Sequence, residues 1–520
     1  MTIDWSLPYP SRREAILAHN VVATSQPLAA QAGLEMLRIG GNAVDAALAS
    51  AIALTVVEPC ANGIGADAFA LVGDGEEIHG LNASGKSPSN YDGSSIEPTG
   101  WSPVTVPGAV SSWVALSEKF GTVDFELLFA PAIRYATEGF LVSRQTAAGW
   151  ARGAARYNSF DSWRATFLPN GTVPNTGEHV ILPDHGTTLQ EIAETRGESF
   201  YRGRLAQEIN NASVKEGGWL RAKDLDAHRC QWIKPLGMPC GSCELLELPP
   251  NGQGIAALLA LGIVQHCDVC LEDCDAPEVL HVQIEAMKYA FADTHAFVAD
   301  PVISGNCEDL LHDDRVTKYA NGISSNASLC EKETIPRYSS TVYVAAGDAR
   351  GQLVSLIQSN FEGFGSGIVI PGTGIAMQNR GMGFSHARGH PNVAEPSKRP
   401  FHTIIPAMLK DQTGAKMAFG VMGGPMQPQG HLQVVSRIVF GNQNPQAALD
   451  APRWKLLGGR KVAIERGFAD SVYEGLHARG HELELAERTV AFGGGQAVYR
   501  LEHGLAGASD QRRDGQAVGF

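Results

Sequence analysis

One helix that is apolar on nearly every side constrains the fold of this chain more than any other feature. Residues 27–59 are predicted to form two helices, broken at Gly40 and Gly41, and apolar residues fill most of the second helix. A helix that is hydrophobic all round is a buried helix. Residues 61–72 then pass from a glycine-rich turn into an apolar strand. With 520 residues, the chain is long enough for a large core, in one to three domains.

Charge and hydropathy exclude several classes of function. The net charge is −14 and no basic run occurs, which argues against nucleic acid as a partner. No uncharged apolar stretch reaches the roughly 18 residues of a membrane-spanning helix, so we expect no membrane contact. The N-terminus lacks the basic and apolar regions of a signal peptide, and we therefore expect a cytoplasmic protein.

The stretch YSSTVYVAAGDARGQLVSLIQSNFEGFG (residues 338–365) predicts two strands joined by a turn. TVYVAA and LVSLIQSN are rich in β-branched and apolar residues, and the residues from Asp348 to Gly351 supply the turn. The preceding segment, residues 331–340, is polar and contains a proline, which is typical of an exposed loop. A cut before Thr341 would give that residue a free α-amine beside its hydroxyl.

A threonine with a free α-amine is a complete catalytic unit. Its hydroxyl is a weak nucleophile until a base removes the proton, and an N-terminal amine can be that base. The pKa of such an amine is about 7.7–8.0 in model compounds, so little tuning is needed. On local sequence alone, however, Ser-Thr at the start of a strand is common without any catalytic role.

The segment TVYVAAGDARGQLVSLIQSNFEGFGSG resembles the processing site of the γ-glutamyltransferase (γ-glutamyl transpeptidase) family of N-terminal-nucleophile hydrolases. ATS…GGNAVDAA near the N-terminus and the ending GASDQRRDGQAVGF follow the same family pattern. The resemblance implies a nucleophile at Thr341 and cleavage between Ser340 and Thr341. It also implies an α+β fold, the four-layer αββα sandwich of these hydrolases, where periodicity alone would indicate only α/β or α+β.

The resemblance further implies one compact domain that is cut once. Residues 1–340 would be the large subunit, and residues 341–520 would be the small subunit, which begins at the nucleophile. The two fragments would form a heterodimer, and whether this heterodimer dimerises in turn stays open.

The resemblance implies catalytic roles for three further residues, and a fourth, next to one of them, is a binding candidate. Gly423 and Gly424, in VMGGPM, match two glycines whose backbone N–H groups bind the oxyanion, usually the largest catalytic contribution in acyl transfer. Without the resemblance, this pair would be interpreted as a plain β-turn. Ser359 matches a hydroxyl that hydrogen-bonds the nucleophile, and the adjacent Asn360 is a candidate for holding the new N-terminus.

The residues that bind the glutamyl group in the family are replaced here. Ser84 stands in the place of an arginine for the α-carboxylate, and Gly383 in the place of an acidic residue for the α-amine. His402 and Thr403 replace two serines, and Ala66 replaces the last glycine of a glycine-rich motif. Without a carboxylate opposite it, a substrate ammonium group would be poorly bound. We therefore expect amide-bond chemistry on a different acyl group.

Arg380, His402, Thr403 and Lys86 are the new candidates for substrate recognition. A cationic cluster suits a small amide that carries a carboxylate, because a guanidinium group pairs with a carboxylate as a fork. A family branch with oxamate amidohydrolase and glutaryl-cephalosporin acylase-like members fits this character. Each charged candidate has an ordinary alternative: an ion-pair partner for Arg380, a core hydrogen bonder for His402, and a solvated loop charge for Lys86.

We therefore predict an autoprocessed amidohydrolase that acts on a small carboxylate-bearing amide through a Thr341 acyl-enzyme, with no metal or organic cofactor. Acyl transfer to an amino acid is less favoured than hydrolysis, because acceptor specificity also depends on the glutamyl site. One alternative is a true γ-glutamyltransferase or glutathione hydrolase. The other is an uncut, non-catalytic relative that acts as a binding or scaffold protein.

Cysteine and histidine patterns give only weak evidence for a metal. Nine cysteines without a signal peptide favour reduced thiols. The pairs Cys240–Cys243 and Cys267–Cys270 have zinc-like spacing, but they are predicted in a hairpin and at the end of an apolar helix. His281 and His295 lie on a predicted amphipathic helix and are interpreted as face residues rather than ligands.

Overall fold

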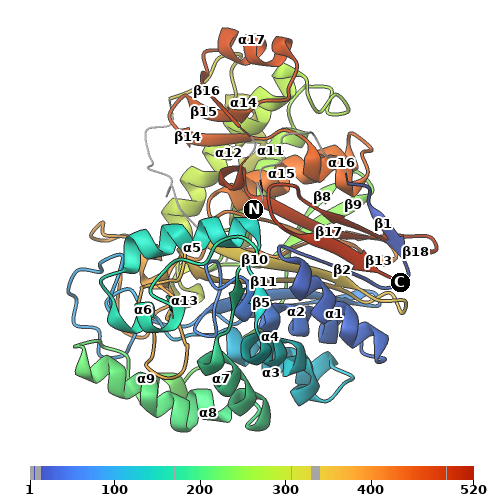
Figure 1. Ribbon diagram of the computed structural model, residues 1–520. Coiled ribbons are helices and arrows are strands. Elements are labelled where there is room, and N and C mark those ends of the chain that lie inside the picture. Colours follow the sequence, from blue (N-terminus) through green and yellow to red (C-terminus); the bar gives the residue numbers. More distant parts are fainter. Residues whose placement is uncertain (1–4, 6–12, 169, 306, 330–339, 488) are drawn as a thin grey trace.

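Two antiparallel sheets, packed face to face, form the centre of the molecule (Figure 1). The computed structural model describes residues 5, 13–168, 170–305, 307–329, 340–487 and 489–520, and within these ranges each of the two sheets has seven strands. The first sheet has the order β19 (Gln516–Gly519), β2 (Val21–Thr24), β10 (Ser340–Gly347), β11 (Leu353–Phe361), β3 (Asp67–Asp74), β4 (Glu77–Asn82) and β7 (Gln231–Ile233). The second has the order β1 (Ile16–Ala18), β18 (Gly504–Ser509), β17 (Gly494–Leu501), β13 (Gly414–Met422), β12 (Ala407–Asp411), β9 (Cys243–Glu247) and β8 (Leu236–Cys240).

Helices cover the outer face of each sheet, so that apolar clusters lie between four layers. The cluster outside the first sheet includes side chains of α1 (Pro27–Arg38), α2 (Ala43–Val57), α3 (Ala109–Phe120), α4 (Ala130–Glu138), α5 (Arg144–Tyr157), α6 (Asp161–Phe167), α7 (Pro183–Glu194), α8 (Glu198–Arg202), α9 (Arg204–Lys215) and α10 (Ala222–Asp226). The cluster outside the second sheet includes side chains of α11 (Gly254–Gln265), α12 (Pro277–Phe297), α14 (Asp313–Gly322), α15 (Met426–Val439), α16 (Pro445–Asp450) and α17 (Asp470–Ala478).

Short elements complete the fold. They are α13 (Pro301–Ser304), the 3₁₀ turns η1 (Phe125–Phe129), η2 (Cys307–Leu311), η3 (Arg380–Gly383) and η4 (Val490–Phe492), and two small sheets, β14 (Trp454–Gly458), β15 (Lys461–Glu465) and β16 (Glu482–Ala486), and β5 (Phe140–Leu141) and β6 (His179–Val180).

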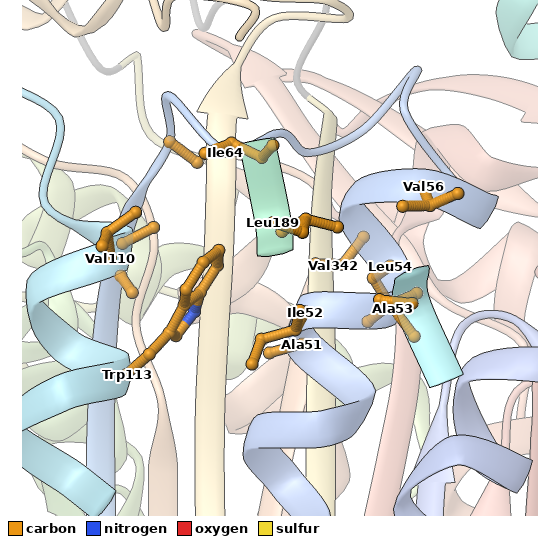
Figure 2. Close-up of a cluster of buried hydrophobic side chains, with 14 of the residues drawn as sticks. Ala51, Ile52, Ala53, Leu54, Val56, Ile64, Val110, Trp113, Leu189 and Val342 are labelled. Carbon is orange, nitrogen blue, oxygen red and sulfur yellow. The ribbon is translucent and has the colours of Figure 1, made fainter. Parts of the chain in front are cut away.

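Helix α2 is the apolar helix predicted from the sequence, and all 15 of its residues are buried. A capping box starts it: the Asn42 side chain accepts a hydrogen bond from the N–H of Asp45 at 3.0 Å, and the Asp45 carboxylate accepts one from the N–H of Asn42 at 2.9 Å. Figure 2 shows side chains of α2 in one cluster with Val342 of β10, Trp113 of α3 and Leu189 of α7. The helix thus supports the outer face of β10.

The turn between β10 and β11 is fixed by one carboxylate. Asp348 Oδ1 accepts hydrogen bonds from the N–H groups of Arg350, at 2.8 Å, and Gln352, at 3.2 Å. Its Oδ2 accepts one from the N–H of Ala43 at 3.0 Å, at the positive end of α2. Gly351 has a φ of +90°, which favours glycine. The predicted pair of strands is confirmed, and its turn is bound to the start of α2.

Strands from the two sides of residue 340 alternate in the first sheet. β2 and β3, which precede residue 340 in the chain, flank β10 and β11, which follow it, and the C-terminal β19 lies outside β2. Val344 of β10 pairs with Thr24 of β2, and Ser359 of β11 pairs with Asp67 of β3. Each part of the chain therefore supplies hydrogen-bond partners that the other part needs.

A buried carboxyl–imidazole pair connects β9 to α15. His431 Nδ1 donates to Glu247 Oε1 at 2.6 Å, and the N–H of Val421 donates to His431 Nε2 at 3.1 Å. Oε2 of Glu247 has no hydrogen-bond partner among the described residues. Burial raises the pKa of Glu247 well above its usual value and lowers the pKa of His431 to about 3.

The four-layer sandwich, the helix break at Gly40 and Gly41, and the β10–β11 hairpin are confirmed. The eight described cysteines are free thiols. Cys240 and Cys243 lie opposite each other in the backbone register of the β8–β9 hairpin, which is confirmed. Cys330 lies outside the described residues, as do residues 331–339 of the expected exposed loop. Among the described helices, none combines the length and the apolar character needed to cross a bilayer.

Candidate active site

Thr341 is the second residue of β10, and its side chain is fully buried. Its hydroxyl donates to Ser359 Oγ at 3.3 Å, and Ser359 Oγ donates in turn to the carbonyl oxygen of Ser340 at 2.7 Å. The N–H of Phe361 also donates to Ser359 Oγ, at 2.8 Å, and holds that hydroxyl in place. The serine therefore contacts both the hydroxyl and the carbonyl on either side of the predicted cleavage site.

Three neighbouring strands bring Thr341, Ser359 and Asp67 to one end of the first sheet. Ser359 and Asp67 are direct partners across β11 and β3, and β10 lies on the other side of β11. Alternate residues of a strand point to the same face. Tyr343 and Phe69, two positions after Thr341 and Asp67, belong to the cluster between the sheets. The three side chains thus belong to the inner face, toward the second sheet.

The glycine pair lies at the end of β13, in the second sheet. Gly423 and Gly424 have φ values of +127° and +59°, which other residues rarely adopt, and α15 follows directly. The side-chain amide of Gln253 donates to the backbone oxygens of Gly424, at 2.9 Å, and Thr403, at 2.6 Å. One buried side chain therefore holds this turn against the segment before β12.

Arg380 is a buried guanidinium with donors to spare. It lies at the start of η3, and its Nη1 donates to Thr403 Oγ1 at 2.9 Å. Its Cζ lies 5.0 Å from the ring centre of Phe361. Nε and Nη2 have no hydrogen-bond partner among the described residues. Burial lowers the pKa of Arg380 to about 9, although the Asp67 carboxylate opposes this shift.

His402 pairs with Asp67 in the same buried region. Its Nε2 lies 3.1 Å from Asp67 Oδ2, its Nδ1 accepts from the N–H of Ile404 at 3.4 Å, and its ring contacts Phe69. The N–H of Gly108 donates to Asp67 Oδ1 at 3.0 Å. Burial raises the pKa of Asp67 to about 7, while burial and the nearby Arg380 lower the pKa of His402 well below its usual value.

Comparison with known proteins decides the family. The gamma-glutamyltranspeptidase family model matches residues 29–520. The chain belongs to this family. The glutathione hydrolase-like YwrD proenzyme of Bacillus subtilis (strain 168) is 34% identical, with 98% of this chain and 100% of that protein covered. The oxamate amidohydrolase proenzyme of Klebsiella pneumoniae subsp. pneumoniae is 33% identical, with 97% and 99% covered.

A solved structure agrees with this assignment. The cephalosporin acylase from Bacillus halodurans has a TM-score of 0.95 and 44% sequence identity, over 100% of this chain and 99% of that chain. The fold of the N-terminal-nucleophile hydrolases and an enzyme of the gamma-glutamyltranspeptidase family, both expected from the sequence, are confirmed.

Gly383 and Ser84, the two positions where the sequence predicts replaced glutamyl-binding residues, have local physical constraints in this structure. A Cβ at Gly383 would overlap the backbone oxygen of Phe401, so the present backbone leaves no room for an acidic side chain there. Ser84 is buried, and its hydroxyl donates to Asn82 Oδ1 at 2.7 Å and accepts from Asn251 Nδ2 at 3.2 Å. Ser84 therefore belongs to a saturated amide cluster.

The structure brings together all but one of the candidates for substrate recognition. Arg380, Thr403 and His402 form one buried cluster. Lys86, in contrast, is exposed and lines a surface pocket of about 230 Å³ together with His228 and Arg399, and neither Thr341 nor Arg380 is part of this lining. The long side chain of Lys86 lies in solvent because the buried residues on either side of it fix the loop with Lys86 facing outward.

Asn360 lies in β11, next to β10, and is buried with both side-chain amide atoms unpaired among the described residues. Gly63 lies against it, since a Cβ at that glycine would come within 2.9 Å of Asn360 Nδ2. An unpaired buried amide is costly, and it is therefore a group available to a new chain terminus or a water molecule.

Sequence reasoning missed Asp67 and Gln253. Asp67 opens the apolar strand DAFALV directly after Ala66, and a carboxylate at the start of a buried strand is itself a signal for a specific partner. Gln253 lies in the PPNGQG segment, where its role depends on Thr403 and Gly424, which are 150 and 171 residues away in the chain. No local pattern could have revealed that contact.

One cluster has residue types that could ligate a metal. The ligand atoms of His281, Glu285 and His481 lie within 4.8 Å of one another, and all three residues are buried. However, His281 Nδ1 and His481 Nε2 already hydrogen-bond at 2.8 Å, and His281 Nε2 contacts the carbonyl of Ser324. The ammonium group of Lys288 pairs with Glu285 at 2.7 Å. These residues fit a hydrogen-bonded network better than a metal site, because the Lys288 ammonium group already occupies the place of a cation beside Glu285.

Proposed function

We propose that this member of the gamma-glutamyltranspeptidase family is an autoprocessed amidohydrolase that uses Thr341 to cleave a small amide with a carboxylate in its acyl group. The observation that carries the proposal is the hydrogen-bond chain from the Thr341 hydroxyl through Ser359 to the carbonyl of Ser340. This chain joins a nucleophile to the carbonyl that it would attack.

Processing would proceed as an N-to-O acyl shift. Thr341 Oγ1 attacks the carbonyl carbon of Ser340, the C–N bond breaks, and the hydroxyl proton ends on the Thr341 nitrogen. Water then hydrolyses the ester, which leaves a carboxylate on Ser340 and a free amine on Thr341. The Ser359 hydroxyl, 2.7 Å from the carbonyl oxygen, would stabilise the negative charge that develops there. The products are residues 1–340 and 341–520.

Turnover would use the same threonine. The new α-amine of Thr341 removes the hydroxyl proton, the hydroxyl attacks the substrate amide, and the N–H groups of Gly423 and Gly424 bind the oxyanion. The amine returns the proton to the leaving group, and water hydrolyses the acyl-enzyme. The unpaired amide of Asn360 is available to bind the new terminus. No step needs a metal or an organic cofactor.

Arg380 carries the proposed acyl specificity. A buried guanidinium with two unpaired nitrogens suits a carboxylate, which accepts two parallel hydrogen bonds from such a fork. The Thr403 hydroxyl holds one nitrogen of this guanidinium, and position 383 has no room for an acidic side chain that could bind a substrate ammonium group. The carboxyl group of Asp67 is already paired with His402. The names of two relatives, oxamate amidohydrolase and cephalosporin acylase, agree with amide hydrolysis on acyl groups other than γ-glutamyl.

Cleavage is tested by a denaturing gel and by intact mass. The wild-type protein should give two fragments that meet between residues 340 and 341, and Thr341→Ala should give one uncut chain. Thr187→Ala, at an exposed threonine of α7, is the matched control and should be cut like the wild type. A persistent single band for the wild type, without turnover, would support the non-catalytic alternative.

Specificity is tested with two anilides that differ in one group. γ-Glutamyl anilide and glutaryl anilide share the amide and the distal carboxylate, and only the first carries an α-ammonium group. We expect a higher kcat/KM on glutaryl anilide or oxamate than on γ-glutamyl anilide. An equal or higher value on γ-glutamyl anilide would favour a true γ-glutamyltransferase instead.

A further inference from the structure

Three buried ionisable groups lie around the proposed acyl pocket. His402 Nε2 lies 3.1 Å from Asp67 Oδ2, and Arg380 Nη1 donates at 2.9 Å to the hydroxyl of Thr403, the residue that follows His402. The charge of Arg380 lowers the pKa of His402 and opposes the rise that burial causes in the pKa of Asp67. With Arg380 charged and Asp67 ionised, the substrate-free cluster has no net charge. A substrate carboxylate on Arg380 would add one negative charge to a region without exposed side chains. Uncompensated charge in such a place is costly.

The hydrogen bonds define which proton is already present. The N–H of Ile404 donates to His402 Nδ1, so Nδ1 is the acceptor nitrogen of the ring. His402 Nε2 then carries the ring proton and donates it to Asp67 Oδ2. The Asp67 carboxyl group is therefore the member of the pair that can take a second proton, because the ring already carries one on Nε2 and burial disfavours a charged imidazole.

We propose that Asp67 and His402 act as one proton acceptor, which takes up a proton from solvent when a substrate carboxylate docks on Arg380. This inference rests on the proposed function, in which Arg380 receives that carboxylate. In the complex, the substrate, Arg380 and the protonated pair have no net charge, so the pocket accepts an anion without gaining buried charge. Asp67 is thereby a specificity-determining residue that does not touch the reacting bond.

The other charged or titratable groups near Asp67 are already occupied. Arg399 donates to the backbone oxygens of Ser84 and Arg229 and to the side chain of Gln231. Tyr201 donates to the carbonyl of Pro107, and its pKa is raised to a range where it stays neutral. Arg380 is therefore the cation with free donors on this side of Asp67 among the described residues.

Proton uptake on binding fixes the sign of the pH dependence. Below the pKa of the free pair, the pair already holds the proton, and affinity for a carboxylate does not change with pH. Since burial raises the pKa of Asp67 to about 7, affinity should fall as the pH rises above neutrality. The fall is about tenfold per pH unit, because each unit removes one factor of ten of the protonated form.

The experiment measures inhibition of the mature enzyme by acetate, propionate and butyrate, each of which brings one carboxylate. The inhibition constant of the tightest of them is followed from pH 6 to pH 8.5 and should stay flat to about pH 7 and then rise about tenfold per unit. Calorimetry at pH 8, in Tris and in Hepes, should show an uptake of close to one proton, since the two buffers release it at different enthalpies.

The variant Asp67→Asn tests whether Asp67 is needed for the proton uptake that accompanies carboxylate binding. Asparagine keeps the size of the side chain and cannot ionise, so the inhibition constant should become independent of pH between 7 and 8.5, apart from any titration of the Thr341 amine. Asp74→Asn, an exposed aspartate at the other end of β3, is the matched control and should keep the wild-type profile. If Asp67→Asn does not fold, the wild-type calorimetry alone decides whether a proton is taken up.

The outcomes separate this inference from the proposed function. Carboxylate binding that depends on Arg380 but takes up no proton overturns the inference and leaves the proposed function standing. A pH profile that is the same in Asp67→Asn and wild type also overturns it. If no carboxylate inhibits and Arg380→Gln leaves turnover unchanged, the carboxylate pocket is wrong and the inference fails with it.

Discussion

Gln253 donates one hydrogen bond to the carbonyl of Thr403, at 2.6 Å, and one to the carbonyl of Gly424, at 2.9 Å, from a single amide nitrogen. Its own backbone N–H donates to the carbonyl of His402 at 3.0 Å. One residue at the start of α11 therefore fixes the spacing between the glycine turn and the segment that contacts Arg380. In the proposed mechanism, that spacing is the distance between the oxyanion site and the acyl pocket.

Gln253→Glu should slow turnover without preventing folding. The carboxylate cannot donate to the two carbonyls and would repel them, so the glycine turn shifts and kcat falls on the order of 100-fold. Steady-state kinetics on the preferred amide measure this. Gln265→Glu, at the other end of α11, is the control and should keep kcat near the wild-type value. An unchanged kcat in Gln253→Glu would contradict the positioning role.

Ser359→Ala should accumulate the uncut precursor. The variant loses the hydroxyl that donates to the Ser340 carbonyl, and the loss of one oxyanion donor slows acyl chemistry by about 10²–10³-fold. A time course on denaturing gels gives the rate of cleavage. Ser359→Thr keeps the hydroxyl and should restore cleavage in part. Wild-type cleavage in the alanine variant would exclude Ser359 from processing.

Arg380→Met should separate processing from substrate recognition. Methionine fills much of the same space but cannot bind a carboxylate, so kcat/KM on glutaryl anilide should fall on the order of 100-fold, as expected for a lost charge-assisted hydrogen bond. The two fragments should still form. Arg388→Met, at an exposed arginine, serves as the control. Equal losses of cleavage and turnover would point to general damage instead.

Glu247→Gln should stabilise the protein at alkaline pH. Burial raises the pKa of Glu247 in the folded state, so its contribution to stability is fully present below the unfolded value, about 4.5, and is lost as the pH rises through the folded value. Glutamine can accept the same hydrogen bond from His431 and does not ionise. The melting temperature of the variant should match the wild type near pH 4.5 and exceed it at pH 8.5, by on the order of 2 °C for each kcal/mol gained.

The control for this prediction is Glu244→Gln, a partly exposed residue of the same strand. Its melting temperature relative to the wild type should change little between pH 4.5 and pH 8.5. A Glu247→Gln variant that loses stability relative to the wild type as the pH rises would contradict the assignment.

Local patterns predicted the elements of the fold, and the family resemblance predicted their layers. The capped, apolar α2 and the β10–β11 hairpin carry their own signals, because capping, periodicity and turn residues act over a few positions. The order of the strands has no such signal. Pairing of Ser359 with Asp67 depends on contacts between segments about 290 residues apart, which periodicity does not encode.

Residues of the candidate site likewise differ in whether a local sequence signal marks them. Thr341, Ser359 and Gly423 were predicted as site residues because each stands in a recognisable motif. Lys86 was grouped with them by charge alone, and the loop that carries it turns its side chain to solvent. Asp67 was missed because its significance depends on His402, 335 positions later in the chain. A charged pair whose members are far apart in the sequence can be recognised only from the folded structure.

Because strands from both sides of residue 340 pair in the first sheet, refolding should differ before and after the proposed cut. In the intact precursor, β10 reaches its place beside β2 by loop closure, and the entropic cost of that step grows slowly with loop length. Once the proposed cut is made, the same pairing requires two molecules to meet, and the intramolecular effective concentration is gone. Denatured mature protein should therefore reassemble only in concentrated solution, whereas the precursor reassembles at any dilution. The folded mature protein would then be maintained by slow unfolding, because it formed when the chain was still continuous and does not readily form again from separate fragments.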